Sequence, residues 1–208
     1  MIHGHPSKRH LHAYATGAAS DGVSLAVAAH LTYCPECRKE VERIEAFGGA
    51  LIGATEAAAP SFDGMLDRLD EVEAPSGVSA PPQTGPLPHV VANAVGVDFD
   101  AIPWRFRLPG VHEYSFAGEN GEEISLLKVR PGASIPKHTH KAEELTVVFD
   151  GELIDGDATF RKGDLAIADP SVDHHPCAGG DRVCICLAVL DGGLRFTGPF
   201  GRALNLFT

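Results

Sequence analysis

The chain has 208 residues, so it can form one ordinary domain or two small ones. Its hydrophobic content of 44% is enough for packed cores and argues against a fully disordered protein. The formal charge of −11 argues against direct binding to nucleic acid, whose phosphates would repel it, and favours a partner with a basic surface.

No apolar run approaches the roughly 18 residues that cross a bilayer. The start of the chain, residues 1–6, lacks the charged-then-apolar pattern of a secretion signal. We therefore expect a cytoplasmic protein without a membrane partner. The five cysteines are an odd number, so a complete disulfide framework is not expected. In a reducing compartment, Cys-x-x-Cys indicates metal or redox chemistry first.

Residues 1–73 carry a helical pattern. Pro6 marks the start of one helix, Ser20 can cap a second and Pro35 opens a third. A fourth, over about residues 61–72, would carry one apolar strip. The members of this strip are Phe62, Met65, Leu66, Leu69 and Val72. Four short helices give a thin core, and small domains of this kind often need a stabilising metal or cross-link.

Residues 74–90 are rich in Ala, Pro, Ser and Gly, a composition typical of linkers. From residue 91 to 208 the pattern changes to short strands separated by turn residues. The clearest strands are 124–129, 144–149, 164–168 and 183–190. Many short strands at this spacing predict an antiparallel β-sandwich or barrel. The chain is therefore predicted to be a small helical bundle followed by an all-β domain.

The first candidate metal site is His30-(three residues)-Cys34-(two)-Cys37. Pro35 biases Cys34 away from helical geometry, so His30 should end one helix while both cysteines begin the next. A helix N-terminus favours thiolates, and two thiolates with an imidazole suit a tetrahedral structural zinc. A fourth ligand is required, and the chain start offers four candidates. They are His3, His5, His10 and His12.

Two other readings of this cysteine pair stay open. It can be a redox dithiol, although a thioredoxin-type dithiol would follow a strand, and a helix precedes it here. It can also be a reduced pair packed without function in a helix junction. We favour zinc because of the ligand spacing.

The second candidate is the pair His138 and His140, which alternate along a strand and so point to one face. Glu144 follows closely and His174 comes later in the chain. Imidazoles with a carboxylate are a ligand set for first-row metals, and this set does not choose among iron, manganese, nickel and zinc. The alternative is a pair of strand histidines that form hydrogen bonds within a barrel and hold no metal.

Three cysteines remain in the strand-rich part. Cys184 and Cys186 share one face of a strand, and Cys177 is close to His174 in sequence. They can be redox sensors, but buried cysteines that act as small hydrophobes are commoner, and we favour that interpretation.

The run from Gly132 to Gly151, with His138, His140 and Glu144 between, resembles the first motif of the cupin superfamily in every spacing. A second, looser motif contains Gly163 and His174. This second motif departs from the usual cupin pattern at three turn and strand positions, which are Asp169, Ser171 and Ala178.

The order of a helical His-x3-Cys-x2-Cys domain, a linker and a cupin is similar to that of the ChrR-type zinc-binding anti-sigma factors, over nearly the whole chain. This resemblance implies His5 as the fourth zinc ligand, with His3 as the substitute. It implies zinc or another divalent first-row metal at a cupin site made of His138, His140, Glu144 and His174.

The same resemblance implies a function and a partner. The helical domain would sequester an extracytoplasmic-function (group IV) sigma factor, and the cupin would be needed for the response to an oxidative signal such as singlet oxygen. A competing class is a metal-dependent cupin dioxygenase, whose open metal positions take substrate and oxygen. The attached zinc-binding helices argue against an enzyme, and also against a simple metal or ligand sensor without a protein partner.

Overall fold

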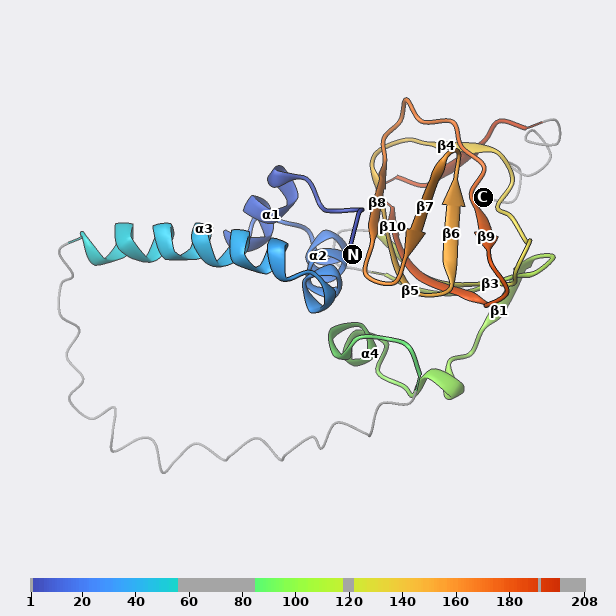
Figure 1. The fold of residues 1–208 in the computed structure, drawn as a ribbon, viewed down its shortest axis with the longest axis horizontal. Coiled ribbons are helices and arrows are strands. Elements are labelled where there is room, and N and C mark those ends of the chain that lie inside the picture. The colour runs from blue at the N-terminus through green and yellow to red at the C-terminus, as the bar shows by residue number, and fades with distance from the viewer. Residues whose placement is uncertain (1, 56–84, 118–121, 191, 199–208) are drawn as a thin grey trace.

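The computed structural model describes residues 2–55, 85–117, 122–190 and 192–198. Its α-helices are α1 (Lys8–Ala15), α2 (Asp21–Tyr33), α3 (Pro35–Gly53) and α4 (His89–Val95), with a 3₁₀-helix η2 (Phe99–Ala101). Its strands are β1 (Arg105–Leu108), β2 (Val111–Ala117), β3 (Glu123–Val129), β4 (His138–His140), β5 (Glu144–Asp150), β6 (Glu152–Asp155), β7 (Ala158–Arg161), β8 (Leu165–Ala168), β9 (Cys177–Gly179), β10 (Cys184–Leu190) and β11 (Leu194–Phe196). Figure 1 shows α1, α2 and α3 to the left of the strand-rich part and α4 below it.

Local capping explains where the helices begin. Ser7 caps α1, and its hydroxyl and the His10 ring form a reciprocal capping box with the backbone. The predicted helix start at Pro6 is thus displaced slightly, because the cap follows the proline. The other two predicted starts are confirmed: Ser20 caps α2, and Pro35 occupies the first turn of α3, where its missing N–H does no harm.

The strands form an antiparallel β-sandwich, as predicted. One sheet has six strands in the order β1-β2-β3-β10-β5-β8, another has three in the order β7-β6-β9, and β11 pairs with β4. An apolar layer between the sheets contains Val129, Val148 and Leu153 together with Cys184 and Cys186. The two cysteines are fully buried there, which agrees with their interpretation as small hydrophobes.

The outer face of the six-stranded sheet is covered by α2 and α4. Leu25, Ala29 and Val91 from these helices pack in one apolar cluster with Leu126 and Leu187 of the sheet. Every residue of β10 is buried as a result, which explains why its sequence is continuously apolar instead of alternating. The helical part and the sandwich therefore share their largest core.

A buried carboxylate connects α2 to the sandwich through hydrogen bonds. Glu122, beside the start of β3, accepts hydrogen bonds from the Ser20 hydroxyl and the Gly22 N–H, both at 2.6 Å. An anion at this position also interacts favourably with the N-terminal end of the helix dipole.

The core of the helical part itself is small. Leu11, Val27 and Val41 pack there with Cys34 and Cys37. Beyond it, the second half of α3 projects from the body of the molecule, as Figure 1 shows. Its large apolar side chains Phe47, Leu51 and Ile52 are exposed by 66%, 58% and 77%.

The structure describes only part of the region in which a fourth helix and a linker were predicted. The expected helix over residues 61–72 and most of the linker over 74–90 lie outside the described residues. At the end of that linker, Leu87 is buried and α4 begins at His89. Among the described residues, no helix combines the length and apolar character needed to span a bilayer.

Candidate metal centres

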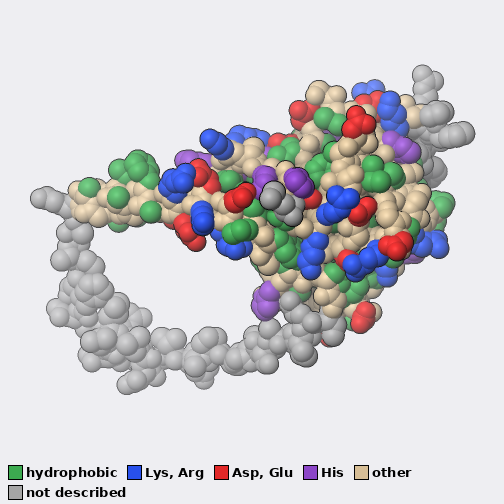
Figure 2. Space-filling model, viewed as in Figure 1, with side chains coloured by type: hydrophobic (Ala, Val, Ile, Leu, Met, Phe, Trp, Pro, Cys, Tyr) green, Lys and Arg blue, Asp and Glu red, His purple; other side chains and the backbone are tan. Residues whose placement is uncertain are grey.

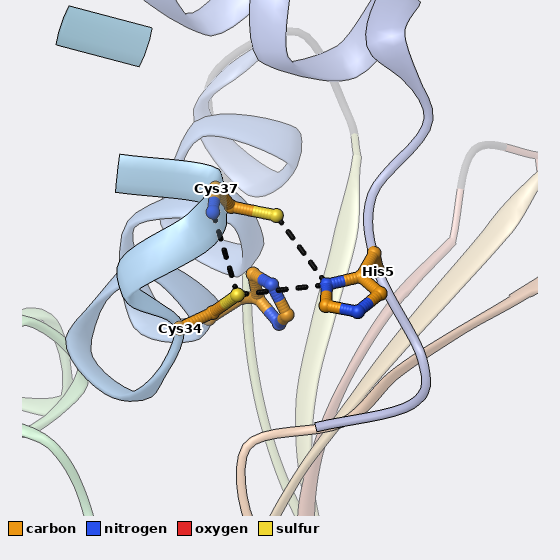
Figure 3. Close-up of side chains that lie close together, drawn as sticks. His5, Cys34 and Cys37 are labelled. Atoms are coloured by element: carbon orange, nitrogen blue, oxygen red, sulfur yellow. Dashed lines mark hydrogen bonds between the residues drawn. The ribbon is translucent and has the colours of Figure 1, made fainter. Parts of the chain in front are cut away.

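The first cluster forms where three segments of the helical part meet. His5 precedes α1, His30 lies in the last turn of α2, Cys34 caps α3 and Cys37 lies in its first turn. One ligand atom from each lies within 4.8 Å of all the others. Figure 3 shows the His5 ring facing both sulfurs, with its Nδ1 at 3.5 Å from Cys34 Sγ and 3.4 Å from Cys37 Sγ. Nitrogen and sulfur ligands on one tetrahedral zinc lie about 3.5 Å apart, so the separation fits.

His30 is oriented as a metal ligand. Its Nδ1–H donates to the carbonyl oxygen of Gly163 at 2.7 Å, which leaves the lone pair on Nε2. That Nε2 is buried without a hydrogen-bond partner. Burial lowers the pKa of His30 to about 4, although the Gly163 carbonyl opposes the shift, so the ring is neutral at physiological pH. A cation at the centre of the cluster would supply the missing partner.

Cys37 needs a cation nearby to ionise. We expected the start of a helix to favour thiolates, but burial and a hydrogen bond from the Cys37 thiol to Cys34 raise the pKa of Cys37 to about 12. Two thiolates this close together repel each other in a buried site. A divalent cation favours the thiolate form over the thiol, because it binds the thiolates and displaces their protons.

The second cluster lies at one end of the sandwich. His138 and His140 come from β4, Glu144 begins β5 and His174 precedes β9, with one ligand atom from each within 4.8 Å of the others. An isolated antiparallel bridge pairs the backbones of His138 and His174, which places their rings together. The register of short strands therefore assembles a set that is spread over 37 residues of sequence.

Hydrogen bonds fix the orientation of two of these histidines. His138 Nδ1–H donates to the Pro136 carbonyl at 2.8 Å, and His174 Nδ1 contacts the Asp155 carboxylate at 2.6 Å. Their two Nε2 atoms then face each other at 3.0 Å. Burial would lower the pKa of His174, but the Asp155 carboxylate raises it, so without metal a proton on His174 Nε2 can be shared with His138 Nε2. A divalent cation between the two rings would take the place of that proton, and the carboxylate–histidine pair is common at metal sites.

The positions of His140 and Glu144 also fit a metal ion at the centre of this cluster. His140 Nε2 and Glu144 Oε2 touch without hydrogen-bond geometry, and both atoms are buried without a hydrogen-bond partner. Burial alone would raise the pKa of Glu144, but His140 and the Thr146 hydroxyl lower it below its usual range, so the carboxylate is charged. Three nitrogens and one carboxylate oxygen fit a divalent first-row metal.

Comparison with known proteins identifies the chain. Residues 92–191 match the family described as the ChrR cupin-like domain. The chain is 37% identical over 202 residues to the anti-sigma-E factor ChrR of Cereibacter sphaeroides, covering 94% of this chain and 92% of that protein. It belongs to the ChrR family of anti-sigma factors. The fold also matches a chain in the crystal structure of Rhodobacter sphaeroides SigE in complex with the anti-sigma ChrR. That match has a TM-score of 0.76 and 34% identity, and covers 92% of this chain and 100% of the other.

Membership of the ChrR family confirms the resemblance drawn from the two motifs, and it confirms the sandwich as a cupin. The structure brings together all eight predicted ligands, four in each cluster. His3, the substitute for His5, is outside the first cluster. The binding of metal by these residues stays a prediction.

Sequence reasoning missed the groups that orient the ligands. Pro136, Asp155 and Gly163 hold three of the histidines by hydrogen bonds, and no motif marked them for that role. His10, another candidate for the fourth zinc ligand, is buried outside the first cluster, and its Nε2 lies 3.1 Å from Glu143, the neighbour of a predicted cupin ligand.

A cavity of about 540 Å³ opens beside the cupin cluster, with His138 and Glu144 in its wall. Much of the remaining lining is apolar, including Leu127 and Phe196, and both basic and acidic side chains, such as Arg195 and Glu113, line the rest. In this ChrR family member, a small molecule could therefore reach the cupin cluster.

Proposed function

We propose that this protein is an anti-sigma factor that sequesters an extracytoplasmic-function sigma factor through its helical part. The observation that carries this proposal is the agreement with an anti-sigma factor over nearly the whole chain, helices and cupin together. The protein is accordingly a regulator of transcription and not an enzyme. A sigma factor works with RNA polymerase, so we place the complex in the cytoplasm.

The proposal divides the chain by role. Residues 1–73 form the sigma-binding part, with zinc held by His5, His30, Cys34 and Cys37. Residues 74–90 connect it to the cupin over 91–208. The cupin holds zinc or another divalent first-row metal and is needed for the response to an oxidative signal such as singlet oxygen. Its proposed ligands are His138, His140, Glu144 and His174.

The surface of α3 supports a protein partner. Figure 2 shows hydrophobic side chains toward the far end of this projecting helix and charged ones nearer the body. The exposed residues Phe47, Leu51 and Ile52 form an apolar face of the kind that lies in a partner groove. The net charge of −11 complements the basic surfaces with which a sigma factor contacts DNA.

Co-purification with the cognate sigma factor tests the proposal. We expect an equimolar complex that blocks transcription by the sigma-bearing polymerase. The cupin variants His140→Ala and Glu144→Gln should form this complex and inhibit normally, but release the sigma factor poorly after exposure to singlet oxygen. His175→Ala, at an exposed histidine outside both the ligand cluster and the cavity beside it, is the matched control and should respond normally. A protein that binds no sigma factor would contradict the proposal.

The competing function, a metal-dependent dioxygenase, is not favoured. The match to an anti-sigma factor includes the helical part, which a dioxygenase does not need. Oxygen consumption by the metal-loaded protein with a simple diketone would favour the enzyme. We expect none.

A further inference from the structure

We propose that the cupin holds two of the four N-terminal metal ligands in place, with Asp164 as the positioning residue. This inference rests on the proposed metal site at His5, His30, Cys34 and Cys37. Asp164 lies in the turn between β7 and β8, and it is 2% exposed. It is 159 positions from His5 in sequence, and it reaches that ligand through the backbone.

Asp164 anchors the segment that carries His5. Its Oδ1 accepts hydrogen bonds from the His3 N–H at 2.6 Å and the Gly4 N–H at 3.0 Å. The Leu165 N–H donates in turn to the Gly4 carbonyl at 3.0 Å. Both backbone groups of the residue before His5 are thus bonded to the cupin. Burial would raise the pKa of Asp164, but these N–H donors lower it, so the acceptor is a charged carboxylate.

The two backbones approach too closely for a side chain at the contact. A Cβ on Gly4 would lie 2.6 Å from the Leu165 carbonyl oxygen. A Cβ on Gly163 would lie 2.5 Å from the side chain of Ile2 and 2.7 Å from that of Tyr33. Glycine on each side therefore permits the contact, and substitution of either should push the N-terminal segment away from the cupin.

The same turn orients the second histidine. The Gly163 carbonyl accepts the Nδ1–H of His30 and so selects the tautomer whose Nε2 faces the cluster. One turn, residues 161–165, therefore holds both histidine ligands. Cys34 and Cys37 are placed separately, by the start of α3. A shift of this turn would move the two imidazoles relative to the two thiolates. Metal binding at this site would then be weaker.

The test uses the full chain with Co²⁺ in place of zinc. Absorption from thiolate-to-cobalt charge transfer reports the N-terminal site alone, because the predicted cupin ligands include no sulfur. In Asp164→Asn the amide has one accepting oxygen, so either the Arg161 N–H or the His3 and Gly4 N–H groups lose their acceptor. Gly4→Ala disturbs the contact while leaving every cupin side chain intact.

We expect a chelator to remove cobalt from both variants about tenfold faster than from the parent protein, in line with the effect of losing a group that supports a ligand. Asp150→Asn is the matched control and should lose cobalt at the parent rate. Asp150 also accepts a backbone N–H, from Gly151, and its carboxylate pairs with Arg182 of the cupin.

The outcomes separate the inference from the proposed site. If the parent protein shows no cobalt–thiolate absorption, the proposed site is wrong and the inference falls with it. If the parent binds cobalt and both variants release it at the parent rate, the site stands and the inference is overturned. Should Asp164→Asn disturb the cupin fold by circular dichroism, the release rate of Gly4→Ala decides.

Discussion

Replacing Cys37 by serine should detach α3 while leaving α2 in place. A serine hydroxyl does not ionise near neutral pH and is a poor zinc ligand, so the cluster would lose its metal. The two helices depend on that metal to different degrees. In α3, two of 19 residues are buried, Cys37 and Val41. In α2, six of 13 are buried, and several of them pack against the cupin sheet.

Comparing the free energies from side-chain burial and from zinc, we expect loss of structure in α3 alone. Burial of the Val41 side chain contributes about 1.5–3 kcal/mol. A structural zinc in a small domain contributes roughly 10 kcal/mol or more. Most helical stability in proteins comes from the packing of an apolar face. Besides Cys37, α3 packs Val41 and the half-buried Ile44 in this core, which is too little to hold it in position without the metal. The cupin contacts of α2 are unaffected by the substitution.

Hydrogen–deuterium exchange resolved by peptide measures this difference. We expect the amides of α3 in Cys37→Ser to exchange orders of magnitude faster than in the parent protein, with the amides of α2 and β10 still protected. Cys177→Ser, at a half-buried cysteine in β9, is the control and should match the parent. Slow exchange throughout α3 in metal-free Cys37→Ser would show that the metal does not hold this helix in place.

Two further predictions concern carboxylates. Glu122→Gln has one accepting oxygen for the two donors at the start of α2, so we expect a loss of about 1.5–3 kcal/mol in the free energy of unfolding, measured by chemical denaturation. An unchanged midpoint would show that these bonds contribute little. Asp155→Asn removes the charged partner of His174 and should weaken metal binding at the cupin about 10- to 100-fold in chelator competition. The exposed Asp157→Asn should have no effect, and equal affinities for the two variants would contradict the assigned role of Asp155.

The ligand clusters could be predicted because their members follow local rules. His30, Cys34 and Cys37 lie on either side of one helix junction, which proline at position 35 marks. His138 and His140 share a strand face by alternation. The spacing of the cupin motifs added Glu144 and His174 as ligands, so the whole second cluster could be predicted.

The contacts between the helices and the cupin could not be predicted in the same way. Glu122 and Asp164 look like ordinary turn carboxylates in the sequence, and their roles depend on which distant backbone lies against them. Helix α4 was also missed, because it follows a proline-rich stretch and is only seven residues long. Packing in the shared core stabilises this helix, and the pattern of apolar residues in the sequence does not reveal that packing.

The proposed metal cluster lies at the base of α3, and the second half of this helix projects away from it. From Val41 to Gly53 the helix extends about 18 Å at about 1.5 Å per residue, and its buried residues lie at the base. Tilting the base by about 5° would sweep the tip through roughly 1.5 Å, by the geometry of a rigid rod of that length. A small change in ligand geometry is thereby converted into a displacement large enough to disrupt close packing against a partner.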